Sequence, residues 1–263
     1  MLSYQHAYHA GNLADVHKHS LLAWTLDYMT RKDKPLSYIE THAGRGLYDL
    51  QDAAAVKTGE AARGIALAEK WFAADHPYRA VLSAIRQKHG ADAYPGSPLI
   101  AAELLRRQDN IHLSELHPQE FDALRGAMTP YGGIFRRKDG WDMAQSLCPP
   151  EPRRGLLLID PSYEVKADYV AIPSRIAKLH RKWSVGVIIL WYPILTDGPH
   201  KPMTNALQKA IPDITIHEVT FPPARAGHRM IGSGLAVINA PYGFTDACAY
   251  VTRHFQNTDK RPM

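Results

Sequence analysis

The chain has 263 residues, of which 45% are hydrophobic and 22% charged, as is typical of a single globular α/β domain with room for an insertion. Its formal net charge is +5, which fits either a polyanionic partner or a solvated basic surface. No apolar run approaches the ~20 residues that span a bilayer, and the start "MLSYQHAYHAGN" lacks the apolar core of a signal peptide. We expect a cytoplasmic protein with no membrane part.

The cysteines and the N-terminal histidines do not predict a metal site. Cys148 and Cys248 lie far apart and match no metal-binding spacing, so we expect free thiols in a reducing compartment. His17 and His19 are two residues apart on an expected helix, which directs their side chains about 200° apart. They cannot both face one ion, and we expect no metal.

The first part of the chain combines one strand with several helices. Residues 12–30 predict a helix that Asn12 can cap. Residues 36–41 predict a short strand that ends in a glycine-containing turn. Residues 47–97 contain two amphipathic helices with no strand between them, and we interpret this stretch as a helical insertion. Residues 1–46 and 98–263 would then form the core, which resumes with a helix that has Pro98 near its start.

The rest of the chain alternates regularly between strands and helices. The expected strands are "NIHLSEL", "GIFRRKDG", "GLLLID", "VGVIILWYP", "ITIHEVTF" and "GLAVINA". Helices separate them except between the last two, and "FTDACAYVTRHF" predicts a final helix. Such alternation indicates an α/β fold with a seven-stranded, mostly parallel sheet and helices on both faces. We expect the last two strands to form an antiparallel edge hairpin, and the helix over 168–183 to be interrupted near Pro173.

Glycines and acids follow the first three strands of the core. In a parallel sheet, ligands bind at the carboxyl ends of the strands. Gly44 and Gly46 let the backbone approach a ligand, Glu115 can hold a ribose diol, and Asp139 with Gly140 can accept an adenine amine. Taken singly, these glycines can serve turn geometry alone and these acids can cap helices. Together they favour a nucleoside cofactor that lies across the strand ends.

The fourth strand ends in "LLLIDPSYE", which predicts a grip on an amine. The Asp160 carboxylate and the Pro161 carbonyl both accept hydrogen bonds and match the two protons of an exocyclic amine. Tyr163 can stack on the ring that bears this amine. A plain strand exit, with Tyr163 covering the core, is the alternative for this segment alone. Beside the expected cofactor residues, the pattern favours an adenine N6 site.

Several longer segments resemble one known family. They are "MLSYQHAYHAGNLADVHKH", "YIETHAGRGLYDL", "YPGSPLIAAELLR", "SELHP", "KDGW", "RGLLLIDPSYEVKADY", "LWYP" and "SGLAVINAP". Together they resemble the bacterial 23S ribosomal RNA adenine-N6 methyltransferase J family, a class I methyltransferase family also labelled as involved in use of external DNA. The resemblance implies a Rossmann-like core with a small helical insertion after the first strand and S-adenosylmethionine as cofactor. It also implies a monomer that methylates 23S RNA, either protein-free or in an early assembly intermediate.

The resemblance also implies roles for single residues. It implies cofactor contacts at Lys18, His19, His42, Gly44, Ser97, Glu115, Asp139, Gly140 and Asp160, catalysis by Asp160, Pro161 and Tyr163, and contacts to substrate RNA at Tyr4, His6, Lys18 and Tyr163. Ser162 departs from the family, whose motif usually has a second proline there. Since the hydrogen-bond acceptors are kept, we expect retained chemistry with a less rigid backbone.

The substrate and the surface that binds it have more than one interpretation. The same chemistry on DNA adenine is the nearest alternative, and a non-catalytic nucleic-acid-binding protein for DNA uptake is another; a small-molecule methyltransferase fits the basic charge less well. Four clusters can hold RNA phosphates or can simply be solvated: Arg31, Lys32 and Lys34; Arg136, Arg137 and Lys138; Arg153 and Arg154; and Arg225, His228 and Arg229. The sequence does not say which of them share a face.

Overall fold

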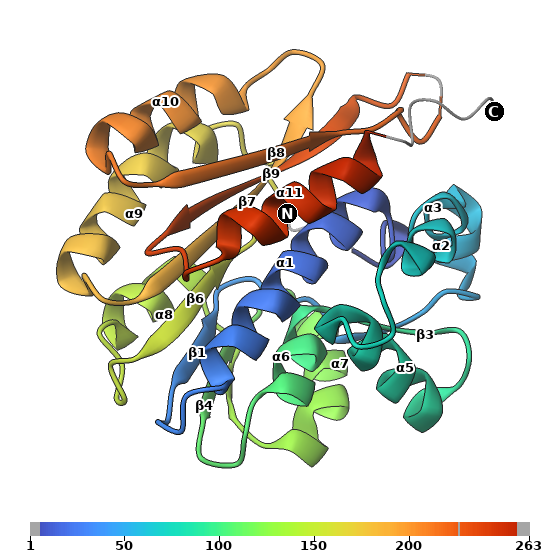
Figure 1. Cartoon of the computed structure of the whole chain (residues 1–263), viewed down its shortest axis with the longest axis horizontal. Coiled ribbons are helices and arrows are strands. Elements are labelled where there is room, and N and C mark those ends of the chain that lie inside the picture. The colour runs from blue at the N-terminus through green and yellow to red at the C-terminus, as the bar shows by residue number, and fades with distance from the viewer. Residues whose placement is uncertain (1–5, 226, 257–263) are drawn as a thin grey trace.

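A computed structural model describes residues 6–225 and 227–256. Its main sheet has seven strands in the order β5-β4-β1-β6-β7-β9-β8, with helices on both faces (Figure 1). The strands are β1 (Ser37–Glu40), β4 (Asn110–Ser114), β5 (Ile134–Arg136), β6 (Gly155–Ile159), β7 (Val187–Leu195), β8 (Thr215–Thr220) and β9 (Met230–Ile238). This is the Rossmann-like α/β architecture expected from the alternation of strands and helices.

All pairs among β5, β4, β1, β6 and β7 are parallel. β9 is antiparallel to both of its neighbours, β7 and β8. The predicted edge hairpin of the last two strands is therefore confirmed, and β9 lies between β7 and the edge strand β8. Strand order changes direction between β1 and β6, which is where open α/β sheets bind their ligands.

The central strand β6 shows how the sheet separates two cores. Leu156 and Leu158 face one hydrophobic cluster, whereas Leu157 and Ile159 face the other. Successive side chains of a strand point to opposite faces, so a strand covered on both sides needs a continuous apolar run. The four apolar residues before Asp160 meet that need and bring Asp160 to the end of a rigid, buried strand.

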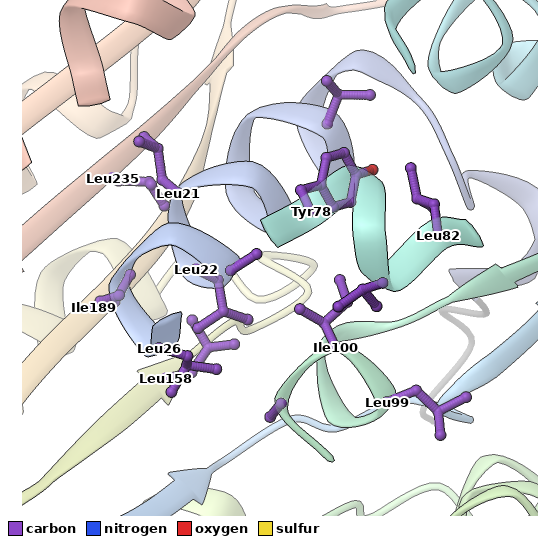
Figure 2. Packing of buried hydrophobic residues seen from close by; sticks show 14 of the residues in the cluster. Leu21, Leu22, Leu26, Tyr78, Leu82, Leu99, Ile100, Leu158, Ile189 and Leu235 are labelled. Atoms are coloured by element: carbon purple, nitrogen blue, oxygen red, sulfur yellow. The ribbon is translucent and has the colours of Figure 1, made fainter. Parts of the chain in front are cut away.

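The first cluster packs under α1 (Leu13–Thr30), α5 (Pro77–His89), α6 (Ser97–Leu104), α7 (Pro118–Met128) and α11 (Phe244–Phe255). The second packs under α8 (Gly140–Leu147), α9 (Asp168–Lys182) and α10 (His200–Ala210). Figure 2 shows Leu22 and Leu26 of α1 close to Leu158 of the sheet, with Ile100 of α6 nearby. Helix α1 is thus buried between the sheet and other helices, and side chains along its length contact several elements.

The predicted helix over residues 12–30 is confirmed as α1. Asn12 caps it, because its side-chain oxygen accepts a hydrogen bond from the Asp15 backbone N–H. A 3₁₀ turn (His6–Tyr8) precedes it, and a second hydrogen bond from the Gly11 N–H to the Asp15 carboxylate closes the loop between turn and helix. The N-terminal segment is thereby held against the start of α1.

The segment between β1 and α6 contains more than the expected helices. Two short strands, β2 (Leu47–Asp49) and β3 (Ala93–Pro95), form a separate antiparallel pair. Between them lie α2 (Ala53–Thr58), α3 (Glu60–Arg63), α4 (Ile65–Ala68), a 3₁₀ turn (Glu69–Trp71) and α5. Tyr78 and Leu82 of α5 belong to the same cluster as α1 and α6 (Figure 2). This segment packs on the core, and its separation as an insertion over 47–97 stays a prediction.

The expected break in the helix near Pro173 is wrong. Helix α9 runs without interruption from Asp168 to Lys182 with Pro173 inside it. A proline removes one backbone donor, but Pro173 lies in the second turn of the helix and is buried. Packing of Ile172 and Ile176 on the sheet outweighs the lost hydrogen bond. Among the described residues, no helix is long and apolar enough to cross a membrane.

Candidate active site

A cavity of about 510 Å³ lies at the carboxyl ends of the parallel strands. Its volume falls within the range of about 300–1,000 Å³ that is usual for small-molecule sites. Most of the predicted site residues line it: His6, Lys18, His19, His42, Gly44, Ser97, Glu115, Asp139, Gly140, Asp160, Pro161 and Tyr163. Tyr4 lies outside the described residues. One cavity therefore joins the glycine turn, the acids after β4 and β5, and the end of β6.

Lys18 and Asp160, which both line this cavity, form a close ion pair. The Lys18 Nζ lies 2.6 Å from Asp160 Oδ2 and 3.2 Å from Asp15 Oδ1, and it stands 5.5 Å from the centre of the Trp191 ring. Burial alone would lower the pKa of Lys18, but the two carboxylates raise it above the ordinary value. Lys18 is a fixed positive charge that neutralises two acids in a largely buried site.

Asp15 links this pair to the N-terminal segment. Its Oδ2 accepts hydrogen bonds from His6 Nε2 and from the Gly11 N–H, both at 2.9 Å. Burial by itself raises the pKa of Asp15, yet His6 and Lys18 together hold it well below the usual value. His6, predicted to contact RNA, therefore lines the cavity and bonds an acid that also holds Lys18. The sequence interpretation assigned no role to Asp15.

The glycine turn and Glu115 are joined by backbone hydrogen bonds. Glu115 accepts from the Gly44 N–H through Oε2 at 2.9 Å and from the His117 N–H through Oε1 at 2.8 Å. Gly44 has φ +62°, and a Cβ there would lie 2.6 Å from the Tyr48 hydroxyl. Burial raises the pKa of Glu115. The turn thus places this carboxyl beside the half-buried backbone of Gly44 at the cavity wall.

Gly140 allows α8 to begin directly against the end of β1. A Cβ at this position would lie 2.0 Å from the Thr41 carbonyl oxygen. Asp139 caps α8, because its Oδ1 accepts from the Asp142 N–H at 3.0 Å. Capping and adenine binding are compatible functions for a carboxylate with two oxygens. His42, at the end of β1, is neutral near pH 7, since burial lowers its pKa to about 4.

A second buried acid, Glu40, lies beneath the cavity. Its Oε1 accepts from Ser97 Oγ at 2.5 Å and its Oε2 from the Tyr38 hydroxyl at 2.8 Å. Burial raises the pKa of Glu40 to about 8. Ser97 begins α6 and lines the cavity, so Glu40 positions a predicted cofactor contact without reaching the cavity itself. An acid inside the fully buried strand "SYIE" was the signal that could have revealed it.

Tyr163 is held rigidly at the cavity wall. Its hydroxyl donates to the Trp191 carbonyl at 2.7 Å, and its ring centre lies 4.7 Å from that of Tyr169. Its φ of +56° is unusual for a non-glycine residue and costs about 1–3 kcal/mol. The side chain is 8% exposed and belongs to the second hydrophobic cluster, so packing fixes the position of its ring. Trp191, which contacts both Lys18 and Tyr163, is a wall residue to which the sequence interpretation gave no role.

A buried hydrogen-bond chain supports Trp191 from behind. The Trp191 Nε1–H donates to Ser233 Oγ, which lies 2.8 Å from His17 Nδ1. The opposite nitrogen of His17 lies 2.9 Å from His217 Nδ1, and His217 Nε2 lies 2.8 Å from Thr252 Oγ1. His19 instead bonds the Tyr94 hydroxyl. In the part of the chain that is described, no group of His, Cys, Asp or Glu is arranged to hold a metal.

A second cavity of about 820 Å³ adjoins the first. Tyr163 and Leu195 belong to the walls of both cavities. It lies beside α9 and α10, and its other lining residues include Lys166, Tyr169 and Arg229. Tyr163 therefore belongs to a wall that the first cavity shares with a second cavity beside it.

The four basic clusters fall on two different edges of the sheet. Arg136 ends β5, and the cluster that contains Arg229 lies in the loop between β8 and β9, where His228 lines the first cavity. These two clusters lie at the carboxyl edge. The loops that contain Arg31 and Arg153 precede β1 and β6 and lie at the opposite edge. Only half of the predicted basic clusters are therefore close to the cavity.

Comparison with known proteins gives consistent results. Residues 33–259 match the family described as Ribosomal RNA large subunit methyltransferase D, RlmJ. The chain is 39% identical to Ribosomal RNA large subunit methyltransferase J of Escherichia coli (strain K12), over 92% of this chain and 88% of that one. The protein of the same name from Haemophilus influenzae is 37% identical over the same shares. A crystal structure from Legionella pneumophila has a TM-score of 0.85 at 34% identity, covering 95% of this chain and 94% of that one.

Proposed function

Because the chain belongs to the RlmJ family of large-subunit ribosomal RNA methyltransferases and is a methyltransferase, we propose that it methylates N6 of an adenine in 23S ribosomal RNA with S-adenosylmethionine as donor. The observation that supports this most is the single cavity shared by Asp160, Pro161, Gly44 and Glu115. An amine held at the end of β6 would face a nucleoside cofactor held after β1 and β4.

The residues present fit S-adenosylmethionine. Gly44 and Gly140 line the cavity at positions where any Cβ would collide with the protein. Glu115 would hold the ribose and Asp139 the adenine, and Ser97 and His42 line the same cavity. When bound, the cofactor supplies an electrophilic methyl group on a sulfonium, so this chain has only to bind, orient and accept a proton.

Asp160 and Pro161 would orient the target amine. Hydrogen bonds from N6 to the Asp160 carboxylate and to the Pro161 carbonyl draw the nitrogen lone pair out of the ring plane and toward the donor. Asp160 would then accept the proton that the nitrogen releases. Since Lys18 already bonds Asp160 Oδ2, it balances the charge of this base and holds the carboxylate in place. The target base must leave its stack to enter the cavity, which favours flexible or single-stranded RNA.

Asp160→Asn tests the assignment with little change of shape. We expect methyl transfer to 23S RNA to fall by at least about 100-fold, because the amide can neither take the proton nor accept through both of its polar atoms. Cofactor affinity measured by calorimetry should change less than threefold. Asp168→Asn, at the rim of the same cavity, is the matched control and should retain activity. Full activity in Asp160→Asn would refute the role of this carboxylate.

The nature of the substrate needs a separate experiment. Tritiated-methyl transfer should be compared on protein-free 23S RNA, assembled large subunits and duplex DNA, followed by mass spectrometry of the nucleosides. We expect N6-methyladenosine in the protein-free RNA or in early assembly intermediates. Preferential labelling of DNA would favour the DNA-adenine alternative. A chain that binds nucleic acid but does not bind S-adenosylmethionine would support the non-catalytic alternative, which the methyltransferase relatives disfavour.

A further inference from the structure

Two of the basic clusters meet at the edge of the sheet opposite to the cavity. Ser37, Asn110 and Gly155 are aligned partners at the starts of β1, β4 and β6. The loops that precede these three strands therefore end side by side. Figure 1 shows the loops before β1 and β4 together at the lower edge of the molecule. The cavity is lined by residues that follow the same strands and lies at the other edge.

Two arginines tie these loops into one surface. Arg106 donates to the carbonyls of Thr30, Lys32 and Lys34 at 2.8–3.0 Å. Arg154 donates to the same Lys34 carbonyl at 3.0 Å and to the Met29 carbonyl. These contacts join residues more than 70 positions apart in the sequence. We call residues 27–34, 106–109 and 151–154 the amino-edge patch.

The amino-edge patch concentrates much of the net positive charge of the chain. Its sixteen residues contain seven Lys or Arg and four Asp or Glu, so they hold +3 of the net +5. Five of the bases are exposed: Arg31, Lys32, Lys34, Arg107 and Arg153. Burial first, and then the nearby Arg106, lower the pKa of Arg154. Cations held close together repel one another, and a bound polyanion reduces this repulsion.

Folding does not require all of these cations. Arg106 and Arg154 donate hydrogen bonds to carbonyls of the loops, and Arg31 forms an ion pair with Asp27 at 2.6 Å. Lys32, Arg107 and Arg153 instead project from a scaffold that those contacts make rigid. A rigid scaffold reduces the entropy lost when phosphates bind to exposed side chains. The arrangement is therefore suited to binding as well as to stability.

We propose that the amino-edge patch binds the phosphate backbone of the substrate RNA. The part it binds is a stem beyond the hairpin that contains the target nucleotide. This inference rests on the proposed function. The strands that separate patch and cavity have four or five residues, so the two lie about 13–17 Å apart at about 3.3 Å per residue. An RNA that binds both the cavity and the amino-edge patch must extend along the protein from one edge of the sheet to the other. A short hairpin around the target adenine reaches the cavity alone.

The experiment compares two RNAs that share the methylated nucleotide. One is a minimal hairpin, and the other carries the same hairpin with at least about ten further base pairs. Affinity is measured by fluorescence anisotropy at several salt concentrations for the wild type and for Arg107→Glu/Arg153→Glu. We expect the variant to bind the extended RNA about tenfold more weakly near 0.1 M salt, with a salt slope smaller by about 1.5. Its affinity and turnover on the hairpin should equal those of the wild type.

The control variant is Lys178→Glu/Lys209→Glu, which reverses two exposed lysines on α9 and α10 and changes the net charge equally. The affinity of this control variant should fall by the same small factor for both RNAs. The inference would be overturned if the patch and control variants lost equal affinity for the extended RNA. It would also be overturned if the patch variant lost equal affinity for both RNAs. If the wild type methylated neither RNA, the proposed function would be contradicted instead. If methylation were intact and the patch variant bound both RNAs as the wild type does, only the role of the patch would be contradicted.

Discussion

The Lys18 ammonium lies 2.6 Å from the Asp160 carboxylate, although 142 positions separate the two residues in the sequence. Removing one partner of a buried ion pair leaves the other charge uncompensated. Lys18→Met should therefore lower the free energy of unfolding by about 3–5 kcal/mol, measured by urea denaturation at pH 7. Lys32→Met, at an exposed position, should change it by less than about 0.5 kcal/mol. Equal effects of both variants would show that the pair adds nothing to stability.

Glu40 should make the protein less stable as pH rises. Burial raises its pKa in the folded protein to about 8 from an ordinary 4.5, so between these values the folded state binds a proton that the unfolded state has released. Stability then falls with increasing pH across this window, by several kcal/mol at about 1.4 kcal/mol per pKa unit. Urea denaturation of Glu40→Gln between pH 5 and 8 should show most of this dependence removed. An unchanged pH profile would contradict the assignment.

His217 should make stability fall toward acid pH. Burial lowers its pKa to about 4 in the folded protein, so below an ordinary value of 6.5 the unfolded state binds the additional proton. Between pH 7 and 5 this costs about 2 kcal/mol. His217→Gln should be less stable than the wild type at pH 7, because it breaks the chain behind Trp191, yet lose less stability on acidification. Replacing the exposed His89 by Asn should change neither the stability at pH 7 nor the stability lost on acidification.

Gly140 and Gly126 form a matched pair for glycine substitution. Gly140→Ala places a Cβ against the Thr41 carbonyl oxygen, so it should displace the start of α8 and cost about 3 kcal/mol of unfolding free energy. Gly126 lies in α7 with no atom within 4 Å of an added Cβ. Gly126→Ala should therefore stabilise by about 0.5–1 kcal/mol. Thermal unfolding of both variants checks the opposite signs, and a loss of stability in Gly126→Ala would contradict this explanation.

Local pattern predicted the seven strands of the main sheet, because each is a short segment that contains β-branched or aromatic residues and alternates with turn or helix patterns. It did not reveal β2 and β3, since three-residue strands are too short to show a period of two. It also predicted a break at Pro173 that packing of α9 prevents. The position of β9 between β7 and β8 depends on pairing between strands, which no single segment encodes.

Positions just after strands predicted Gly44, Glu115 and Asp160, whereas the family resemblance implied Lys18 and Ser97. The described site residues line one cavity. Asp15, Glu40 and Trp191 received no role, because each contributes through partners distant in sequence: Asp15 through Lys18, Glu40 through Ser97, and Trp191 through Tyr163. The chemistry of a residue can be inferred from its type and its place at a strand end. Its charge state and hydrogen-bond partners depend on burial and on neighbours that only the folded chain supplies.

The amino-acid sequence by itself determined the alternation of strands and helices and the residues at the strand ends, since these follow from local apolar periodicity and turn chemistry. The tertiary structure decided which side chains meet: Lys18 with Asp160, Glu40 with Ser97, and the loops before β1, β4 and β6 with one another. The reason is physical, because hydrogen bonds and ion pairs act over a few ångströms in space, whatever the separation along the chain.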